Sequence, residues 1–157
     1  LAGQNQKYLY DQLVYFVNGE RENALMTAVI PYLKTLSADE LLDVAAYYSE
    51  SSASFGQADS NADLLALGES LYRAGDLNRG IPACTACHSL YGEGNIQAGF
   101  PKISGQQKGY LISTLKEYRS QSRNAGNYAL VMQAASANLK DDDIEALANY
   151  MHGLYRK

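Results

Sequence analysis

Cysteine and histidine are scarce in this chain of 157 residues, which contains two of each. A structural zinc site needs four such ligands, so both cysteines and both histidines would have to meet at one ion. No apolar run approaches the length of a membrane span, and no signal peptide is recognisable, although a chain that starts Leu1-Ala2-Gly3 without methionine looks processed or cut. A basic stripe is also absent, and the net charge of −4 argues against a nucleic acid partner.

Three of these four scarce side chains stand within five positions, in the pentapeptide Cys84-Thr85-Ala86-Cys87-His88. Two thiols three positions apart, with a histidine directly after the second, form the attachment pattern of a c-type haem. Both cysteines would bond to the vinyl groups of one porphyrin, and the imidazole of His88 would reach the iron. Two alternatives stay open. One is a zinc site, and the other is a redox dithiol of the thioredoxin type, although no strand–helix–strand pattern surrounds the motif.

Length and charge place bounds on the organisation of the chain. A chain of this size forms one large domain or two small ones, and a small domain buries too little surface to be stable without added support, which a covalent haem supplies. Residues 1–60 hold 3 basic and 8 acidic side chains, whereas residues 61–157 hold 10 basic and 9 acidic ones. The part that contains the pentapeptide is therefore nearly neutral, and the other part is acidic.

An incomplete internal repeat runs through the chain. Residues 1–4 (LAGQ) correspond to residues 103–106 (ISGQ) at an offset of 102, and residues 36–41 correspond to residues 139–144 at an offset of 103. In the second copy the haem-attachment motif lies before this matching stretch. The equivalent motif of the first copy would fall before residue 1, so we expect the chain to begin partway through a first haem domain.

The hydrophobic periodicity predicts an all-α fold without a convincing strand. Gly19 is placed to end the first helix, and Ser37 with Glu40 forms a capping box before the second. Residues 51–61 lose the periodicity and are interpreted as a connecting segment. Helices are expected over about 6–17, 41–48, 62–74, 106–120 and 141–152.

Three segments carry a resemblance to a known family: IPACTACH at 81–88, GFPKISGQ at 99–106 and IEALANYMHGL at 144–154. Their order resembles class I cytochrome c, and specifically the second domain of the dihaem cytochrome c4 family. Residues 1–50 resemble the later part of that family's first domain. The resemblance therefore covers essentially the whole chain.

The resemblance implies a class I cytochrome c fold in tandem, with haem c as the cofactor. Residues 1–53 are expected to be the remnant of a first domain without its haem-attachment segment, residues 54–61 a linker, and residues 62–157 a complete domain. One covalent haem would be held by Cys84 and Cys87, and a second haem is expected in the native full-length protein.

The second axial ligand of the iron must come from few candidates. Met132 lies 44 residues after His88 in a stretch expected to be irregular, and it matches the axial methionine of the resembled family. Met151 and His152 lie at the end of the last expected helix, where packing and capping are the simpler interpretations. Met26 would be the corresponding ligand in the first half, if a first-domain haem is present.

Other side chains are expected to surround the haem. The resemblance implies that His88 donates its remaining ring N–H to the backbone carbonyl of Pro101, which would fix the orientation of the imidazole. Tyr110, Arg119 and Arg123 are candidates for hydrogen bonds to the haem propionates, although an arginine on a helix face is usually just solvated. The expected apolar walls are Leu90, Phe100, Ile103, Leu111, Leu115, Leu130, Leu139 and Leu147.

The expected function is electron transfer rather than catalysis, because an iron with six strong ligands changes its oxidation state with little rearrangement and has no open position for oxygen or peroxide. A dihaem peroxidase with one labile axial position and a haem-free thiol–disulfide oxidoreductase stay as alternatives. The resemblance implies a bacterial periplasmic carrier, soluble or held near the membrane. Its donor would be a quinol-oxidising complex and its acceptor a terminal oxidase.

Overall fold

The computed structural model describes residues 1–155, which form helices joined by turns and loops, with no strand among them. The elements are α1 (Gln6–Asn18), α2 (Ile30–Leu33), α3 (Ala38–Glu50), α4 (Ala62–Arg73), the short 3-10 helix η1 (Leu77–Arg79), α5 (Thr85–His88), α6 (Lys108–Arg119), α7 (Ala129–Ser136) and α8 (Asp141–His152). None of the helices in this described part has the length and apolar character needed to cross a bilayer. The predicted all-α fold is confirmed.

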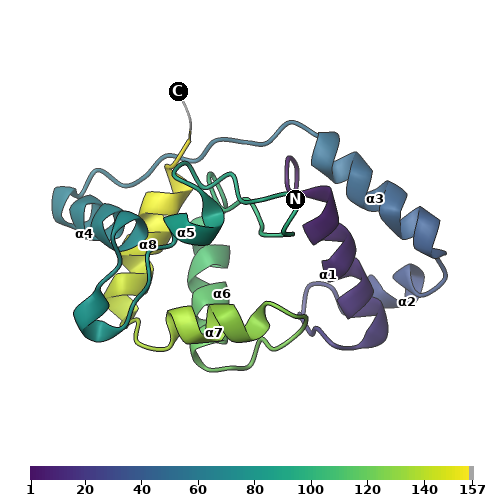
Figure 1. Ribbon diagram of the computed structural model, residues 1–157. Coiled ribbons are helices and arrows are strands. Elements are labelled where there is room, and N and C mark those ends of the chain that lie inside the picture. Colours follow the sequence, from purple (N-terminus) through teal and green to yellow (C-terminus); the bar gives the residue numbers. More distant parts are fainter. Residues whose placement is uncertain (156–157) are drawn as a thin grey trace.

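The helices form two groups that lie side by side (Figure 1). We call residues 1–50 the first unit, in which α1 packs on α3, and residues 62–155 the second unit, in which α8 packs against both α4 and α6. The segment between α3 and α4 runs along one edge of the molecule from the first unit to the second. The N-terminus lies between the two units (Figure 1).

Local sequence explains where the helices of the first unit begin and end. α1 ends at Gly19, whose φ of 75° lies in the left-handed region that glycine adopts without a steric penalty. At the start of α3, the Ser37 hydroxyl accepts from the backbone N–H of Glu40 (3.2 Å), and the Glu40 carboxylate accepts from the backbone N–H of Ser37 (2.8 Å). Both predicted helix ends are confirmed.

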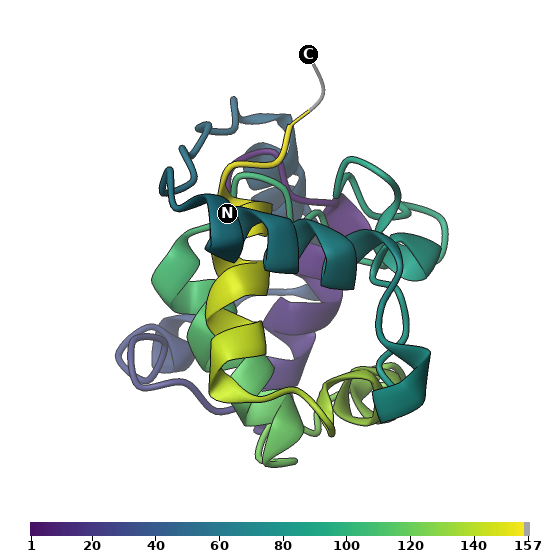
Figure 2. The ribbon, with the colours of Figure 1, turned by 90° about the vertical axis from the view of Figure 1, so that its left-hand side faces the viewer.

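The crossing of α4 over α8 shapes the second unit (Figure 2). Gly68 lies at the crossing, where a Cβ atom would collide with the backbone carbonyl of Ala146 on α8. Tyr72, one turn later on α4, is fully buried and donates its hydroxyl to the carbonyl of Ser89 (2.7 Å), just after α5. The core therefore extends from α8 through α4 to the residues that follow α5.

The two units differ in how completely they bury apolar side chains. In the first unit, several large side chains are exposed, including Leu25 (88%), Tyr32 (66%) and Tyr47 (69%). Its buried apolar residues are Leu9, Phe16, Leu33, Leu41 and Ala45. The second unit has a larger continuous core, made of Leu71, Tyr72, Ile81, Leu111, Leu115, Leu139, Ile144, Leu147, Ala148, Met151 and Leu154.

The segment between α3 and α4 contains the predicted linker, residues 54–61, and has no helix. Two hydrogen bonds join it to the second unit. The backbone N–H of Asp59 donates to Asn149 Oδ1 (2.8 Å), and the Asn149 amide donates to the Asp59 carbonyl (3.3 Å). The rings of Phe55 and Tyr155 also meet edge to face, with centroids 5.6 Å apart. The segment thus packs along α8, and its role as a linker between domains stays a prediction.

Candidate haem-binding site

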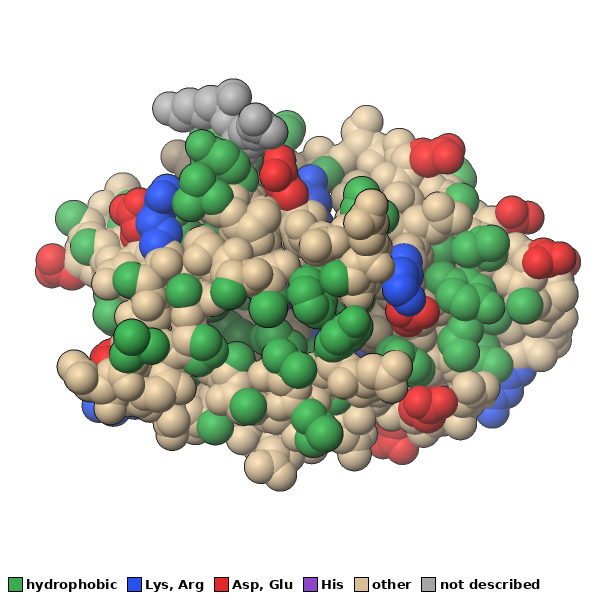
Figure 3. Space-filling view, in the orientation of Figure 1, with side chains coloured by type: hydrophobic (Ala, Val, Ile, Leu, Met, Phe, Trp, Pro, Cys, Tyr) green, Lys and Arg blue, Asp and Glu red, His purple; other side chains and the backbone are tan. Residues whose placement is uncertain are grey.

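The CTACH motif folds as a single helical turn, α5, with Cys84 at its N-cap. The backbone N–H of His88 donates to the Cys84 carbonyl (3.0 Å). Residues three and four apart on a helix share a face, so this turn groups Cys84, Cys87 and His88. Both cysteines are half-buried free thiols. Figure 3 shows a hollow bordered by hydrophobic side chains on the face between α5 and α7.

His88 is buried and oriented by one hydrogen bond. Its exposed fraction is 7%, and Nδ1 lies 3.0 Å from the carbonyl oxygen of Pro101, the contact that the resemblance implied. A carbonyl only accepts, so Nδ1 carries the proton and Nε2 keeps its lone pair. Burial lowers the pKa of His88 and outweighs the opposite effect of the Pro101 bond. The imidazole is therefore neutral at pH 7, and the lone pair of Nε2 can bind a metal.

The Pro101 carbonyl belongs to a tight loop that begins after α5. Asn95 and Phe100 exchange both of their backbone hydrogen bonds (2.9 and 3.1 Å), which closes the turn between them. Gly94 has a φ of 75°, and a Cβ atom there would collide with the carbonyls of Phe100 and Pro101. This glycine therefore allows the loop to fold back until the Pro101 carbonyl reaches His88.

The surroundings of Cys84 suit neither a redox dithiol nor a zinc site. Burial raises the pKa of the Cys84 thiol to about 11, whereas the reactive cysteine of a CxxC oxidoreductase works as a thiolate with a lowered pKa. Among residues 1–155, no group of three or more Cys, His, Asp and Glu side chains could hold a metal ion. Both alternatives that the sequence left open for the motif therefore lose support.

Met132 lies in helix α7, which corrects the sequence-based expectation of an irregular stretch over residues 124–135. Ala, Leu, Met and Gln fill most of residues 129–136, and all four favour helix, so this short run forms a helix despite the irregular sequence before it. Met132 is half-buried and packs against the same core cluster as Cys84. Its role as the axial ligand stays a prediction.

The other candidate ligands lie elsewhere. Met151 is 3% exposed in α8 and belongs to the core, in keeping with its interpretation as a packing residue. His152 is hydrogen-bonded through Nδ1 to the carbonyl of Gln106 (2.8 Å). Met26 lies half-buried in the turns between α1 and α2, with its backbone N–H donating to the Asn23 carbonyl (3.0 Å).

Arg123 is buried at the boundary between the two units, with an exposed fraction of 6%. Its guanidinium donates to the hydroxyls of Tyr8 (2.9 Å) and Tyr110 (3.3 Å) and to Gln12 Oε1 (3.2 Å). Arg21 of the first unit donates to the same Tyr110 hydroxyl (3.3 Å) and the same Gln12 oxygen (2.6 Å). Two arginines thus converge on neutral acceptors, and no carboxylate from residues 1–155 hydrogen-bonds to either of them. We call these five side chains the boundary cluster.

The boundary cluster carries excess positive charge. Burial alone would raise the pKa of Tyr110, but the charges and hydrogen bonds of Arg123 and Arg21 lower it to about 8. A haem propionate at this cluster would neutralise part of that charge and weaken the effect of the two arginines on Tyr110, so the propionate contacts of Tyr110 and Arg123 stay predictions. Sequence reasoning missed Tyr8 and Gln12, although their spacing of four on an expected helix places them on one face.

Arg119 lies in a different environment. One guanidinium nitrogen donates to the carbonyl of Leu139 (2.9 Å), and another pairs with the Asp141 carboxylate (2.6 Å). Asp141 also pairs with Lys116 (3.2 Å), so these contacts tie α6 to the start of α8. The structure does not bring Arg119 into the boundary cluster, and its contact with a propionate stays a prediction.

The expected apolar walls divide into two sets. Leu90 follows α5 and Leu130 lies in α7, the helices on either side of the hollow, and these two side chains are exposed at 44% and 75%. Phe100 is half-buried, with its ring edge to face with Tyr128 at a centroid distance of 4.9 Å. Ile103 packs against the core, and the remaining members lie within it: Leu111, Leu115, Leu139 and Leu147.

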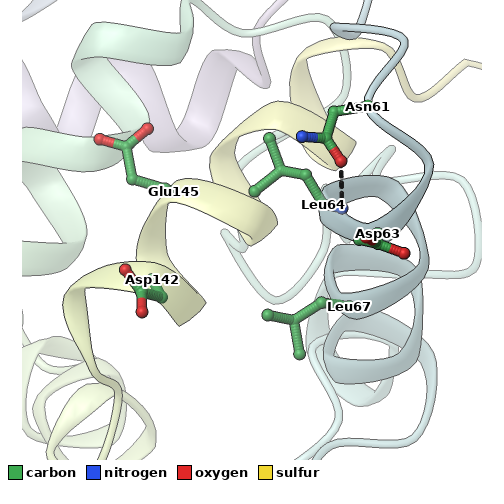
Figure 4. A pocket seen from close by; sticks show the side chains of 6 residues that line it. All are labelled: Asn61, Asp63, Leu64, Leu67, Asp142 and Glu145. Carbon is green, nitrogen blue, oxygen red and sulfur yellow. Dashed lines mark hydrogen bonds between the residues drawn. The ribbon is translucent and has the colours of Figure 1, made fainter.

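A separate pocket lies between α4 and α8 (Figure 4). Leu64 and Leu67 of α4 line it together with the carboxylates of Asp63, Asp142 and Glu145. No histidine, cysteine or methionine contributes to its lining. This pocket therefore offers no ligand for a haem iron and is distinct from the site at α5.

Comparisons with known proteins agree with the fold. The sequence profile of the cytochrome c family matches residues 65–154. Cytochrome c4 from Pseudomonas aeruginosa is 39% identical over 155 residues, which covers 99% of this chain and 75% of that protein. A thiosulfate dehydrogenase electron acceptor from Thiomonas intermedia is 35% identical, covering 96% of this chain and 68% of that protein. The crystal structure of reduced recombinant cytochrome c4 from Pseudomonas stutzeri matches with a TM-score of 0.89 and 40% identity, covering 98% of this chain and 83% of that structure.

The helical fold and the CTACH turn define an electron-transfer cytochrome with covalently bound haem c. Within that class, the chain belongs to the cytochrome c4 family. It is an electron carrier and not an enzyme, and the predicted family, fold and cofactor are confirmed. Cytochromes c4 are dihaem proteins of the bacterial periplasm, in agreement with the second haem expected from the repeat.

Proposed function

We propose that this protein carries single electrons through a haem c that is attached to Cys84 and Cys87 and ligated by His88 and Met132. The observation that carries the proposal is the hydrogen bond from His88 Nδ1 to Pro101, because it leaves Nε2 of a buried, neutral imidazole available beside two free thiols on one helical turn. Met132 is supported by its place against the core that Cys84 also borders.

Each of these residues has a distinct task. Haem c, when bound, supplies the one-electron chemistry of its iron. Cys84 and Cys87 would hold the porphyrin by covalent bonds, and His88 is oriented by Pro101 to bind the iron. Met132 would supply a thioether ligand, which favours a higher reduction potential than a second imidazole. An iron bound by both His88 and Met132 would favour electron transfer over peroxidase chemistry.

The proposal extends to the first unit, where Met26 would ligate the second haem. The repeat supports this assignment, because α1, α2 and α3 occupy the order of α6, α7 and α8, and Met26 lies before α3 as Met132 lies before α8. Leu25 beside Met26 is 88% exposed, and Tyr32 is 66% exposed. A haem packed on this side would cover apolar side chains that residues 1–155 leave open.

The proposed donor is a quinol-oxidising complex and the proposed acceptor a terminal oxidase, with the carrier soluble or held near the membrane. Exposed apolar side chains near the α5 site support docking of a redox partner: Leu90 follows α5, and Leu130 and Val131 lie on α7. Exposed apolar side chains of this kind suit the brief complexes through which electron carriers work.

A second candidate donor is a thiosulfate-oxidising enzyme. The similarity to a thiosulfate dehydrogenase electron acceptor, at 35% identity over 96% of this chain, favours this donor specifically. Stopped-flow reduction of the oxidised protein by a quinol-oxidising complex and, separately, by thiosulfate dehydrogenase with thiosulfate would decide between them. We expect saturating, rapid reduction by the physiological donor, and a reduction rate no faster than that of an unrelated cytochrome c would exclude the donor tested.

The haem site itself is tested with the purified holoprotein. The haem should stay with the polypeptide during acid–acetone extraction, give a pyridine haemochrome spectrum of the c type, and bind carbon monoxide poorly in the ferrous state. Release of the haem into the acetone would contradict thioether attachment. Rapid carbon monoxide or peroxide binding would favour the peroxidase alternative.

A further inference from the structure

The N-terminal segment of the first unit reaches across to the loop that holds His88. Gln4 is 8% exposed, and its side-chain amide binds both backbone groups of Lys102. Oε1 accepts from the Lys102 N–H (2.7 Å), and Nε2 donates to the Lys102 carbonyl (2.8 Å), across 98 positions of sequence. One side chain thus binds the backbone of the residue that follows Pro101.

Asn5 makes the corresponding contact on the other side of Pro101. Its exposed fraction is 7%, and Nδ2 donates to the carbonyl of Phe100. Pro101 itself has no N–H, and its carbonyl accepts from His88 Nδ1 (3.0 Å). The backbone on both sides of the acceptor of His88 is therefore hydrogen-bonded to the first unit.

The second unit provides few other backbone hydrogen bonds to the residues around Pro101. Before Pro101, Asn95 and Phe100 pair with each other, and after it the next two N–H groups beyond Lys102 donate to the Gly92 carbonyl (2.8 and 3.1 Å). Neither attachment uses the N–H or the carbonyl of Lys102. Without the amide of Gln4, both of these backbone groups would lose their partner within residues 1–155.

We propose that Gln4 and Asn5 are positioning residues for His88, which hold the Pro101 carbonyl and so set the strength of the hydrogen bond from Nδ1. The proposal rests on the proposed function, in which His88 ligates the haem iron. A stronger bond at Nδ1 makes the imidazole a better electron donor to ferric iron and lowers the reduction potential. The first unit thereby tunes the haem of the second unit through the Pro101 loop.

The internal repeat supplies a matched control. Gln106 is the counterpart of Gln4, and in both residues the side-chain oxygen accepts from the backbone N–H of the next residue, at 2.9 Å for Gln4 and 2.8 Å for Gln106. Of the two, only Gln4 also hydrogen-bonds the Pro101 loop. Gln4→Met and Gln106→Met therefore remove the same local contact, and only the first removes the contact with Lys102.

The test measures His88 directly in the holoprotein. In the ferrous state, ¹⁵N-histidine NMR follows the Nδ1–H of His88 and its exchange with solvent, and a redox titration gives the potential of the same haem. We expect Gln4→Met to speed this exchange about tenfold, which is what losing about 1.4 kcal/mol of restraint produces, and to raise the potential. Asn5→Ala should shift both quantities in the same direction and serves as the second variant if Gln4→Met does not fold.

Three results define the outcome. Faster exchange and a raised potential in Gln4→Met, with both unchanged in Gln106→Met, would support the proposal. Unchanged exchange in both Gln4→Met and Asn5→Ala, or equally fast exchange in Gln106→Met, would overturn it. Failure of the proposed function is distinguishable, because the unmodified protein would then show no iron-bound His88 at all.

Discussion

The two units share one helical arrangement but bury its apolar face to different extents. Tyr47 on α3 and Tyr150 on α8 are counterparts in the repeat. Tyr150 packs against Tyr72 of α4, with ring centroids 5.4 Å apart, whereas Tyr47 is 69% exposed. The comparison shows that three repeat helices do not enclose a core by themselves. In the second unit α4 and the α5 turn supply the cover, and residues 1–61 contain no counterpart of these two helices.

The same comparison relates the haem site to the core. α4 covers α8 because Gly68 allows close approach, and Tyr72 then reaches the carbonyl of Ser89 behind α5. The helix that completes the core of the second unit is therefore also the one that supports the attachment turn. Substitutions that disrupt α4 or the α5 turn should therefore leave the apolar side chains of the second unit less buried, as they are in the first unit.

The largest effect is expected from replacing both Cys84 and Cys87 with serine. Without thioether bonds the haem is no longer retained covalently. The free energy of unfolding of the second unit should also fall considerably, because a small domain depends on the covalent haem for stability. A pyridine haemochrome assay of the denatured protein and urea unfolding followed by circular dichroism measure the two effects. Thr85→Ser, in the same turn, is the control and should keep the haem; covalent haem in the double variant would contradict the prediction.

A smaller, more local effect is expected from Met132→Ala. Loss of the thioether opens the sixth position, so ferrous protein should bind carbon monoxide and the reduction potential should fall. The control is Leu130→Ala on the same helix, because Leu130 is 75% exposed and is not a ligand. If the spectrum and the reduction potential of Met132→Ala are unchanged, another residue is the axial ligand. The assignment of Met26 by analogy with Met132 would then lose its support.

Two glycine-to-alanine substitutions distinguish the effect of the close α4–α8 contact on stability from the effect of helix propensity. In Gly68→Ala the new methyl group collides with the backbone of α8, and overpacking of this kind costs about 1–3 kcal/mol. In Gly109→Ala on α6 the new methyl group meets nothing within 4 Å apart from the adjacent residues and backbone of its own helix, so the variant should gain up to about 1 kcal/mol from helix propensity. Urea unfolding of both holoproteins measures the changes. Equal stability of the two variants would mean that the crossing does not limit the second unit.

Sequence patterns predicted the local parts of this structure well. The bounds of α8 at residues 141–152, the capping box at Ser37 and the glycine end of α1 depend on neighbouring residues alone. The spacing of Cys84, Cys87 and His88 is likewise a local pattern. Family membership supplied the contact with Pro101, which periodicity does not encode.

The contacts between the units could not be predicted in the same way. The partner of Gln4 and the first-unit partners of Arg123 lie roughly a hundred positions away in the sequence, and a polar residue on a helix or loop gives no local sign of such a partner. α7 was missed for a different reason, because its eight residues are too few to show a helical period. Burial of Arg123 also overrode the usual expectation that a surface arginine is solvated.

The smallest expected effect concerns the boundary cluster, where the two units meet. The pKa of Tyr110 is lowered from its ordinary value of 10.0 to about 8, although burial opposes this, because Arg123 and Arg21 favour the phenolate. Between about pH 8 and pH 10 the folded protein therefore binds fewer protons than the unfolded chain, so this contribution to stability grows as pH rises and is lost as pH falls through about 8. Tyr110 is 37% exposed, so solvent screening should keep the contribution below about 1 kcal/mol.

This titration can be followed in the holoprotein by NMR with ¹³C-labelled tyrosine. One tyrosine should titrate near pH 8 in the unmodified protein, the signal should be missing in Tyr110→Phe, and Arg21→Gln should move it toward 10 because one of the two charges is removed. If Tyr110 titrates only near its ordinary pKa, an anion neutralises the two arginines. The boundary between the two units then carries no excess positive charge.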